Sequence, residues 1–449
     1  MKKSFLIKTY GCQMNFAESD RLRKLLVKSG WNESASIKDA GLVIAVGCSV
    51  RQKAENRVLS FLKSNKHLKK NGALLGLVGC TANLHGEKIL KQLPFLDIVC
   101  GPNHLASIID NLSGFTGQQI IVRTGESDDP FLEYIPSNNE ITMDVPITKG
   151  CNNFCSYCIV PFSRGKLKSR KPESILQEIK CAVEKGIKSV TLLGQNVNEY
   201  GKDFTNGYDF ADLVREIANI DGLLRIGFLT SHPEDTGKKI LKTMAECSKV
   251  LKHLHIPVQS GSDKILKKMN RKYTVEKFLE VVEMARDMMP EISITSDIIV
   301  GFPEETEHDF EQTYELVKKT RFSELFIFKY SPRPMTKAYN MKDDVSKQEK
   351  ERRHKIILDM QKKISNEILS SFAGKTCQVL AEKISVKNPS QIIGKNIQGI
   401  SVTFQGDKNI LGTIARIKIV NHREGILCGS ICEAALSPQD LQCPGKTQK

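Results

Sequence analysis

The chain has 449 residues, of which 40% are hydrophobic and 26% are charged. This composition excludes a disordered chain and, at this length, favours a folded protein of several domains. Lys and Arg outnumber Asp and Glu by 66 − 51 = 15, and such an excess favours phosphate-rich partners such as nucleic acids.

Neither a membrane protein nor a secreted protein is expected. No segment reaches the roughly 20 apolar residues that span a bilayer, and the amino terminus lacks the apolar core of a signal peptide. We therefore expect a cytoplasmic protein. Reducing conditions keep thiols free there, so the 13 cysteines favour metal binding, catalysis or burial over a disulfide framework.

The first 110 residues alternate short apolar runs with polar or helical stretches, which predicts an α/β unit with a parallel sheet. The runs span residues 4–9, 42–46, 74–78 and 96–99. A cysteine follows each run within three residues, and these are Cys12, Cys48, Cys80 and Cys100. Because the carboxyl ends of parallel strands meet at one edge of a sheet, these four thiols could meet in space.

The middle of the chain predicts a second α/β domain. Residues 114–139 are rich in turn-forming and acidic residues and predict a linker. From about residue 141 to residue 337, strand-like runs alternate with amphipathic helices, which predicts a full or, by preference, partial parallel barrel with functional groups at the carboxyl ends of its strands. The runs span residues 189–193, 224–229, 253–258, 293–300 and 324–328.

A long basic helix is predicted over residues 346–371 and is expected to pack on the barrel. After Gly374 the short runs are rich in β-forming residues, which predicts a small all-β barrel of about 60 residues. The last dozen residues resemble a flexible tail. The domain limits expected on this basis are 1–120, 137–372, 373–436 and a tail at 437–449.

Residues 150–165, GCNNFCSYCIVPFSRG, place Cys151, Cys155 and Cys158 at C-x3-C-x2-C spacing. Three thiolates on one loop can each bind one iron of a cubane and leave the fourth iron open. A structural zinc site would need a fourth ligand, and Cys181, the nearest candidate, is expected to be a buried small side chain.

The motif resembles that of the radical S-adenosylmethionine (SAM) superfamily. The resemblance implies that SAM binds the open iron and is cleaved there to a 5′-deoxyadenosyl radical. Tyr157 is a candidate neighbour of SAM, and packing within the loop is an equal alternative.

Three segments of the amino-terminal part resemble the first domain of methylthiotransferases, and the resemblance extends over nearly the whole chain. The segments are TYGCQMN (9–15), GCSVRQKAENR (47–57) and GLVGC (76–80). The family match implies that Cys12, Cys48 and Cys80 bind a second [4Fe-4S] cluster. Cys100 matches no ligand position and is expected to pack beneath the sheet edge.

Further blocks resemble the branch of that family that makes 2-methylthio-N6-isopentenyladenosine (dimethylallyladenosine) in tRNA. Each block alone could be an ordinary βα junction, but their order along the chain carries the resemblance. The blocks are LLGQNVNEYG (192–201), TSHPED (230–235), HIPVQSGSDKILKKMNRKYT (255–274), TSDIIVGFPEETEHDF (295–310) and FKYSPRP (328–334). The chain departs from the family pattern at Val46, Gly47 and Asn83, and at Leu167, where the local string resembles sister enzymes that modify a ribosomal protein.

Polar residues at strand ends in these blocks are candidates for contact with SAM. Gly194 and Gln195 are expected to meet its amino group. The residues expected to line SAM or the substrate are Ser231, Gln259, Ser260 and Asp297. A purely structural role is about as common at such positions. His232 and His255 could equally be packing histidines, and neither is assigned as a metal ligand.

The carboxy-terminal runs, and GKNIQGISVTF (394–404) above all, resemble a TRAM domain, a β-barrel that binds RNA. The candidate phosphate contacts are Lys375, Lys395, Lys408 and Arg416. The predicted fold is thus α/β, with a Rossmann-like first domain, a partial (β/α) barrel and a TRAM barrel. The implied cofactors are SAM and two [4Fe-4S] clusters. The implied partners are the anticodon stem-loop of tRNA, an electron donor protein and a sulfur or Fe-S supply system, for a chain expected to be a monomer.

The reaction implied by the resemblance converts N6-(dimethylallyl)adenosine at position 37 of tRNA to its 2-methylthio derivative. It would use two SAM molecules, one as methyl donor and one as radical source, and sulfur from the auxiliary cluster. The alternatives are methylthiolation of threonylcarbamoyladenosine in tRNA or of an aspartate in a ribosomal protein. An RNA-binding protein with structural clusters and no catalysis is the alternative from a different class.

Overall fold

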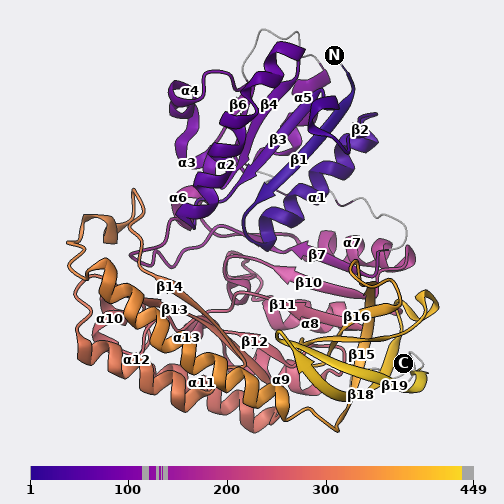
Figure 1. Ribbon diagram of the computed structural model, residues 1–449, viewed down its shortest axis with the longest axis vertical. Helices are drawn as coiled ribbons and strands as arrows, with labels where there is room; N and C mark the ends of the chain where they lie inside the picture. Colours follow the sequence, from indigo (N-terminus) through magenta and orange to yellow (C-terminus); the bar gives the residue numbers. More distant parts are fainter. Residues whose placement is uncertain (1, 114–120, 128–130, 133, 135–139, 437–449) are drawn as a thin grey trace.

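The computed structural model describes residues 2–113, 121–127, 131–132, 134 and 140–436. They form an amino-terminal α/β domain, a central crescent of strands and helices, and a carboxy-terminal β-barrel beside one end of that crescent (Figure 1). No described helix combines the length and the apolar character needed to cross a membrane. The predicted tail, 437–449, lies outside the described residues.

The amino-terminal domain is a six-stranded parallel sheet in the order β2-β1-β3-β4-β5-β6. Its two central strands, β3 and β4, are buried throughout because helices cover both faces. Along β3, for example, Leu42 and Ile44 pack in one core while Val43 and Ala45 pack in the other. The strands are β1 Ser4–Tyr10, β2 Asn32–Glu33, β3 Leu42–Gly47, β4 Leu74–Gly79, β5 Ile98–Cys100 and β6 Ile121–Arg123. The helices are α1 Gln13–Lys28, α2 Gln52–Ser64, α3 Cys80–His85, α4 Ile89–Gln92 and α5 Ala106–Ser113.

The stretch predicted as a linker, 114–139, contains a strand of this sheet. Residues 121–123 form β6, which pairs with β5 and places Ile121 in the core. The acidic and turn-forming neighbours concealed the strand, because three residues are too short for an alternating pattern to stand out.

The central domain is a crescent of parallel strands with helices on its outer side (Figure 1). Two three-stranded sheets, β11-β10-β7 and β12-β13-β14, are linked by a parallel bridge between Ile226 and Val250. The strands are β7 Thr142–Pro146, β10 Ser189–Leu193, β11 Arg225–Phe228, β12 His253–His255, β13 Ser293–Val300 and β14 Glu324–Lys329, with a short pair β8 Thr148–Lys149 and β9 Lys168–Ser169. The helices are α6 Val160–Arg164, α7 Pro172–Glu184, α8 Phe210–Ala218, α9 Lys238–Glu246, α10 Asp263–Lys268, α11 Val275–Met288 and α12 Glu307–Thr320.

One predicted strand of the crescent is shorter than expected. The run 253–258 is a strand only over β12, which ends at His255. Beyond it, the Val258 N–H donates to the Ser296 hydroxyl at 3.0 Å, and Gln259 has a φ of 73°. A side chain therefore replaces the regular backbone partner of Val258, and the left-handed Gln259 keeps only an isolated parallel bridge to Ile298 of β13.

The long basic helix, α13 Lys347–Ser370, packs on the crescent as predicted, with Ile357 and Ile364 in its core. It leads into a closed barrel in the order β15-β16-β17-β19-β18. The barrel contacts the crescent where Leu380 and Ile414 pack against Leu224. Its strands are β15 Thr376–Ile384, β16 Gln391–Asn396, β17 Ser401–Gln405, β18 Ile414–Arg423 and β19 Ile426–Leu436.

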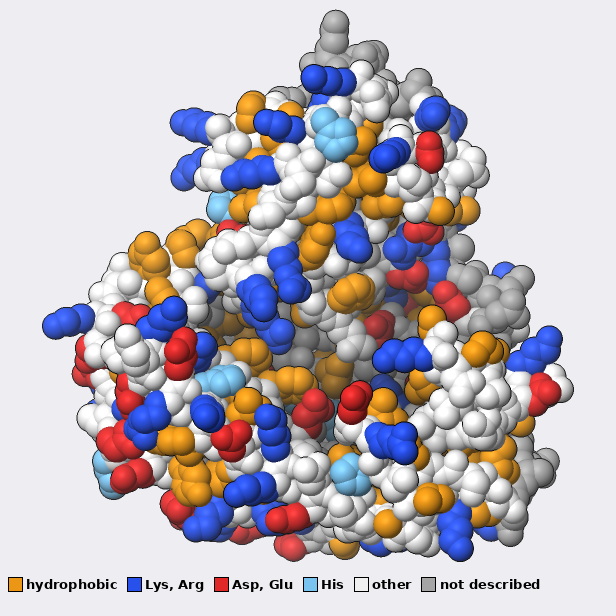
Figure 2. Space-filling model, in the orientation of Figure 1, with side chains coloured by type: hydrophobic (Ala, Val, Ile, Leu, Met, Phe, Trp, Pro, Cys, Tyr) orange, Lys and Arg blue, Asp and Glu red, His pale blue; other side chains and the backbone are white. Residues whose placement is uncertain are grey.

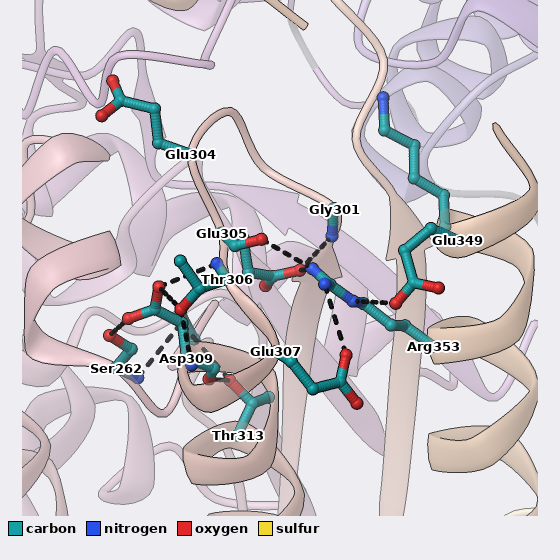
Figure 3. Close-up of polar contacts among 12 residues, drawn as sticks. Ser262, Gly301, Glu304, Glu305, Thr306, Glu307, Asp309, Thr313, Glu349 and Arg353 are labelled. Carbon is teal, nitrogen blue, oxygen red and sulfur yellow. Dashed lines mark hydrogen bonds and ion pairs between the residues drawn. The ribbon is translucent and has the colours of Figure 1, made fainter. Parts of the chain in front are cut away.

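The polar block that follows β13 holds α12 and α13 together (Figure 3). Glu305 is completely buried and accepts hydrogen bonds from the Gly301 N–H at 2.5 Å and from Arg353 Nη1 at 2.7 Å. Asp309 accepts from the Thr306 N–H at 2.9 Å and from the Ser262 hydroxyl at 2.7 Å. The carboxylates of this block therefore serve the fold rather than the chemistry.

Arg353→Met should destabilise the protein by about 3–5 kcal/mol, because it leaves the buried Glu305 carboxylate without its cation. Arg352→Met is the matched control, since the neighbouring Arg352 pairs with Glu307 and Glu349 at the surface and should cost less than about 1 kcal/mol. Thermal unfolding of the two variants measures the difference. Equal losses would show that the Glu305 contact contributes no more than a surface ion pair.

Candidate active site between two cysteine sets

The first set of cysteines lies at one edge of the amino-terminal sheet. Cys12, Cys48 and Cys80 directly follow β1, β3 and β4 or lie one residue further, and these strands are adjacent in the sheet. A hydrogen bond between the thiols lowers the pKa of Cys12 to about 6, and the same bond and then burial raise the pKa of Cys48. Burial raises the pKa of Cys80. Three thiols that are far apart in the sequence therefore lie close together in the structure, as expected.

Cys100 does not join this set. It ends β5, is fully buried in the apolar core, and its Sγ donates to the His104 carbonyl at 3.2 Å. The prediction of a buried packing residue is confirmed for Cys100. For Cys181 it is wrong, because that residue is only half-buried on α7, where its Sγ accepts from Gln177 at 3.3 Å.

The second set lies on the loop between β8 and α6, which neighbouring strands hold in place. The Gly150 N–H donates to Gln195 Oε1 at 2.6 Å, and Cys151 Sγ lies 3.7 Å from Glu199 Oε2. Burial raises the pKa of Cys151 and of Cys158 to about 12. Both thiols are therefore protonated until a metal replaces the proton.

The donor sets fit iron–sulfur cubanes. All six thiols are free. Among the described residues, no three His, Cys, Asp or Glu side chains gather around a point that one metal ion could occupy. A cubane does not require such a point, because each cysteine binds a different iron. Three thiols in each set match that need and leave one iron open for another ligand.

A buried ionic network joins the two sets. Arg164, at the end of α6, donates to both carboxylate oxygens of Glu18 on α1, at 2.8 and 3.0 Å, and hydrogen-bonds the Cys80 thiol. Lys149 lies 3.2 Å from the same carboxylate. Burial opposes ionisation of Glu18, but the two cations outweigh it and hold the pKa of Glu18 below its usual value.

A second buried arginine ties the end of the crescent to the first set. Arg333, in the loop after β14, is 4% exposed and donates to the Glu55 carboxylate, to Gln52 and to the backbone carbonyl of Ser49. Ser49 directly follows Cys48. The sequence shows the PRP segment that contains Arg333, but nothing in it predicts the contact of Arg333 with Ser49, which lies 284 residues earlier in the chain.

Comparisons with known proteins agree with this geometry. Two family models match, the radical SAM superfamily over residues 145–317 and the uncharacterized protein family UPF0004 over residues 4–101. The tRNA-2-methylthio-N(6)-dimethylallyladenosine synthase of Thermoanaerobacter sp. (strain X514) is 40% identical over 95% of this chain and 92% of the relative. The synthase of Aquifex aeolicus (strain VF5) is 38% identical over 96% of this chain and 99% of the relative.

The chain belongs to the tRNA-2-methylthio-N(6)-dimethylallyladenosine synthase family. The predicted methylthiotransferase family is thereby confirmed, as are SAM and [4Fe-4S] clusters as cofactors.

Solved structures support the fold class. The radical SAM methyltransferase TsrM from Kitasatospora setae, solved with cobalamin and a [4Fe-4S] cluster, has a TM-score of 0.55 at 12% identity over 76% of this chain and 74% of that chain. The cobalamin-dependent radical SAM enzyme OxsB has a TM-score of 0.51 at 13% identity over 81% of this chain and 56% of that chain. At these identities the likeness concerns the fold alone.

In this member of the synthase family, the departures from the pattern are accommodated by packing. Thr81 occupies the space beside Gly47 at the end of β3. A Cβ atom at position 47 would lie only 2.6 Å from the Thr81 hydroxyl oxygen, so glycine is needed there. Asn83 joins α3 to α6, because its Nδ2 donates to the Ser163 carbonyl at 3.1 Å. Leu167 is buried, and its N–H donates to Asn152 Oδ1 at 3.1 Å.

The candidate SAM residues at strand ends divide into two groups. Gln195 holds the cysteine loop through its hydrogen bond with Gly150. At position 194 only glycine fits, because a Cβ atom there would lie 2.2 Å from the Thr148 hydroxyl oxygen. Tyr157 accepts from Arg271 at 3.0 Å and packs in an apolar cluster. Ser260 lies 3.4 Å from the Thr313 hydroxyl of α12. These contacts give the four residues structural roles, and their contact with SAM stays a prediction.

The other group has polar atoms that protein does not satisfy. Within the described residues, Ser231 Oγ and Gln259 Oε1 are buried without a hydrogen-bond partner, as is Asn153 Nδ2 in the cysteine loop. Buried polar atoms nearly always have a hydrogen-bond partner, so these three atoms are candidates for hydrogen bonds with a polar ligand. Asp297 lies 3.7 Å from His255, whose Nδ1 is 2.9 Å from the Thr295 hydroxyl.

His232 is a packing histidine, as read from the sequence. It stacks edge-on against Tyr273 and accepts from the Glu234 N–H at 3.3 Å, and burial lowers its pKa to about 2.

The basic candidates of the TRAM-like barrel lie on different strands and turns. Lys395 and Arg416 pair with Leu380 and Gln378 across β15, so both lie on one outer face of the barrel. Lys375 precedes β15, and Lys408 lies in the turn before β18, both exposed. The contact of these residues with RNA stays a prediction.

Replacing Cys12, Cys48 and Cys80 together by Ala should halve the iron content of anaerobically reconstituted protein, from about eight to about four irons per chain. The Cys151, Cys155 and Cys158 set would be left intact. Iron and sulfide analysis with Mössbauer spectroscopy measures the change. Cys100→Ala is the control and should keep about eight irons, because Cys100 faces the core. A triple variant with full iron content would show that the second cluster lies elsewhere.

Proposed function

We propose that this chain transfers a methylthio group to carbon 2 of N6-(dimethylallyl)adenosine at position 37 of tRNA. The observation that carries the proposal is the pair of three-thiol sets, which belong to different domains and are held together by Glu18 and Arg164. Relatives that match almost the whole chain are named as synthases of that product. The pattern of one radical site and one sulfur site suits such a transfer.

The carbon 2 C–H bond is not acidic, so acid–base chemistry does not break it readily. When bound, the clusters and two SAM molecules supply the radical, the methyl group and the sulfur. The chain's own residues hold and orient these groups. Gln195 fixes the Gly150 backbone beside Cys151, while Arg333 fixes the Ser49 carbonyl beside Cys48.

The Arg164 cation also tunes the first set. Burial raises the pKa of Cys80, but the positive charge of Arg164 and its hydrogen bond to the thiol act in the opposite direction. Arg164 therefore favours the thiolate that a metal requires. Burial of Glu18 and Lys149 around it keeps water away from the junction between the two sets.

Several partners belong to this proposal. The tRNA would be bound through its anticodon stem-loop, where an unstacked base can leave the loop. An electron donor protein and a sulfur or Fe-S supply system would serve the clusters. We propose further that the chain works as a monomer in the cytoplasm.

The decisive measurement is anaerobic incubation with SAM, a reductant and isopentenyl-modified tRNA, followed by mass spectrometry of the nucleosides. We expect isopentenyladenosine to gain one methylthio group. The triple Cys12, Cys48 and Cys80 variant should still cleave SAM but leave the nucleoside unchanged. SAM cleavage without modification by the unaltered chain would refute this substrate, and threonylcarbamoyladenosine in tRNA and the ribosomal protein aspartate would then be tested in the same assay.

A further inference from the structure

A cavity of about 600 Å³ lies where the three domains meet, and none of the six candidate cluster cysteines is among its described lining residues. Its walls come from α1, from the inner face of β7, β10 and β11, and from β15 and β16 of the carboxy-terminal barrel. Figure 2 shows the hollow between these parts, with basic and acidic side chains around it. The volume is sufficient for one nucleotide.

Arg225, the first residue of β11, is the unusual group in this cavity. Ile226 and Phe228 pack outward against the helices, so Arg225 points to the inner face of the crescent. It is 2% exposed, and its Nη1 donates to the Leu224 carbonyl at 3.3 Å. Within the described residues, Nε and Nη2 have no hydrogen-bond partner, and no carboxylate forms an ion pair with it.

A buried guanidinium without a carboxylate destabilises a fold, so its presence calls for a ligand. Burial lowers its pKa to about 10, which still leaves it charged at neutral pH. The two free nitrogens can donate side by side to a planar group with two acceptors.

The remaining walls indicate which ligand suits the cavity. Phe16 of α1 is 54% exposed and offers a flat apolar surface at the cavity. Charged side chains of both signs line the rest of the cavity, and they are Arg21, Arg23, Lys383 and Lys395 with Asp20, Glu140, Asp144 and Glu382. Because these charges nearly balance, the lining offers no strongly positive surface for a polyphosphate. A nucleobase presents donors, acceptors and a face for stacking, and so matches the mixed lining.

We propose that this cavity binds an unstacked nucleotide of the RNA loop other than the one that reacts, with its base on Phe16 and its acceptor edge toward Arg225. This inference rests on the proposed function. The cavity is lined by Thr142, Ser189 and Arg225, the first residues of β7, β10 and β11, whereas the polar candidates for SAM contact follow the carboxyl ends of the strands. The occupant is therefore a different nucleotide from the one beside the cysteines.

The test measures binding of a fluorescent anticodon stem-loop containing isopentenyladenosine to the full chain, as Kd against salt concentration. Arg225→Met and Phe16→Ala should each weaken binding by about tenfold, through lost hydrogen bonds and lost stacking. The slope of log Kd against log salt should stay unchanged in Arg225→Met, as for a base contact. Its thermal midpoint should not fall, because the variant removes an unpaired buried cation.

Val27→Ala is the control for Phe16, since Val27 is equally exposed on the same helix but does not line the cavity. Unchanged affinity in both cavity variants would overturn the proposal. A fall in the salt slope by about one would replace the base with a phosphate as the ligand of Arg225 and overturn the base assignment. If the unaltered chain failed to modify tRNA while Arg225→Met still lost RNA affinity, the proposed function would fail and the cavity assignment would stand.

Discussion

The relation between the two cysteine sets depends on the contact of Glu18 with Arg164 and Lys149. The three side chains are each 3% exposed, and they come from α1, α6 and β8. Buried ion pairs add little net stability, but a partner left alone costs several kcal/mol, so the network selects one arrangement of the two domains. It also carries one more cation than anions. That excess lies beside Cys12 and Cys80, and it would be balanced by the thiolates that these residues would carry as cluster ligands.

The parts of this site that sequence reasoning could predict share one property, a position relative to a regular strand. Cys12, Cys48 and Cys80 follow apolar runs that are long enough to be recognised, and the parallel sheet then brings them together. The three-residue strand β6 lies among acidic and turn-forming residues and shows too few alternations to be recognised. The strand β12 ended early because Ser296 replaced a backbone partner, a contact between distant segments that no local pattern records.

The arginines that organise the site escaped prediction for a different reason. A charged residue is read from sequence as exposed, because unpaired burial is costly. Arg164 and Arg333 are buried with partners more than 140 and 270 residues away, and Arg225 is buried with no carboxylate paired to it in the part of the chain that the structure describes. Their positions within the SRG and PRP segments and at the start of a strand carried no sign of these surroundings.

The carboxy-terminal barrel acts by position more than by charge. Leu380 and Ile414 pack on Leu224, which precedes β11, and the Lys252 N–H, just before β12, donates to the Ile397 carbonyl at 2.8 Å. The barrel is therefore fixed against the amino-terminal ends of strands from both sheets of the crescent. Leu224 directly precedes Arg225. The same contact that seats the barrel therefore closes one wall of the cavity around Arg225 and carries Lys395 to its rim. A net charge of +15 favours association with nucleic acids in general, whereas this seating fixes one particular basic side chain, that of Lys395, beside the cavity.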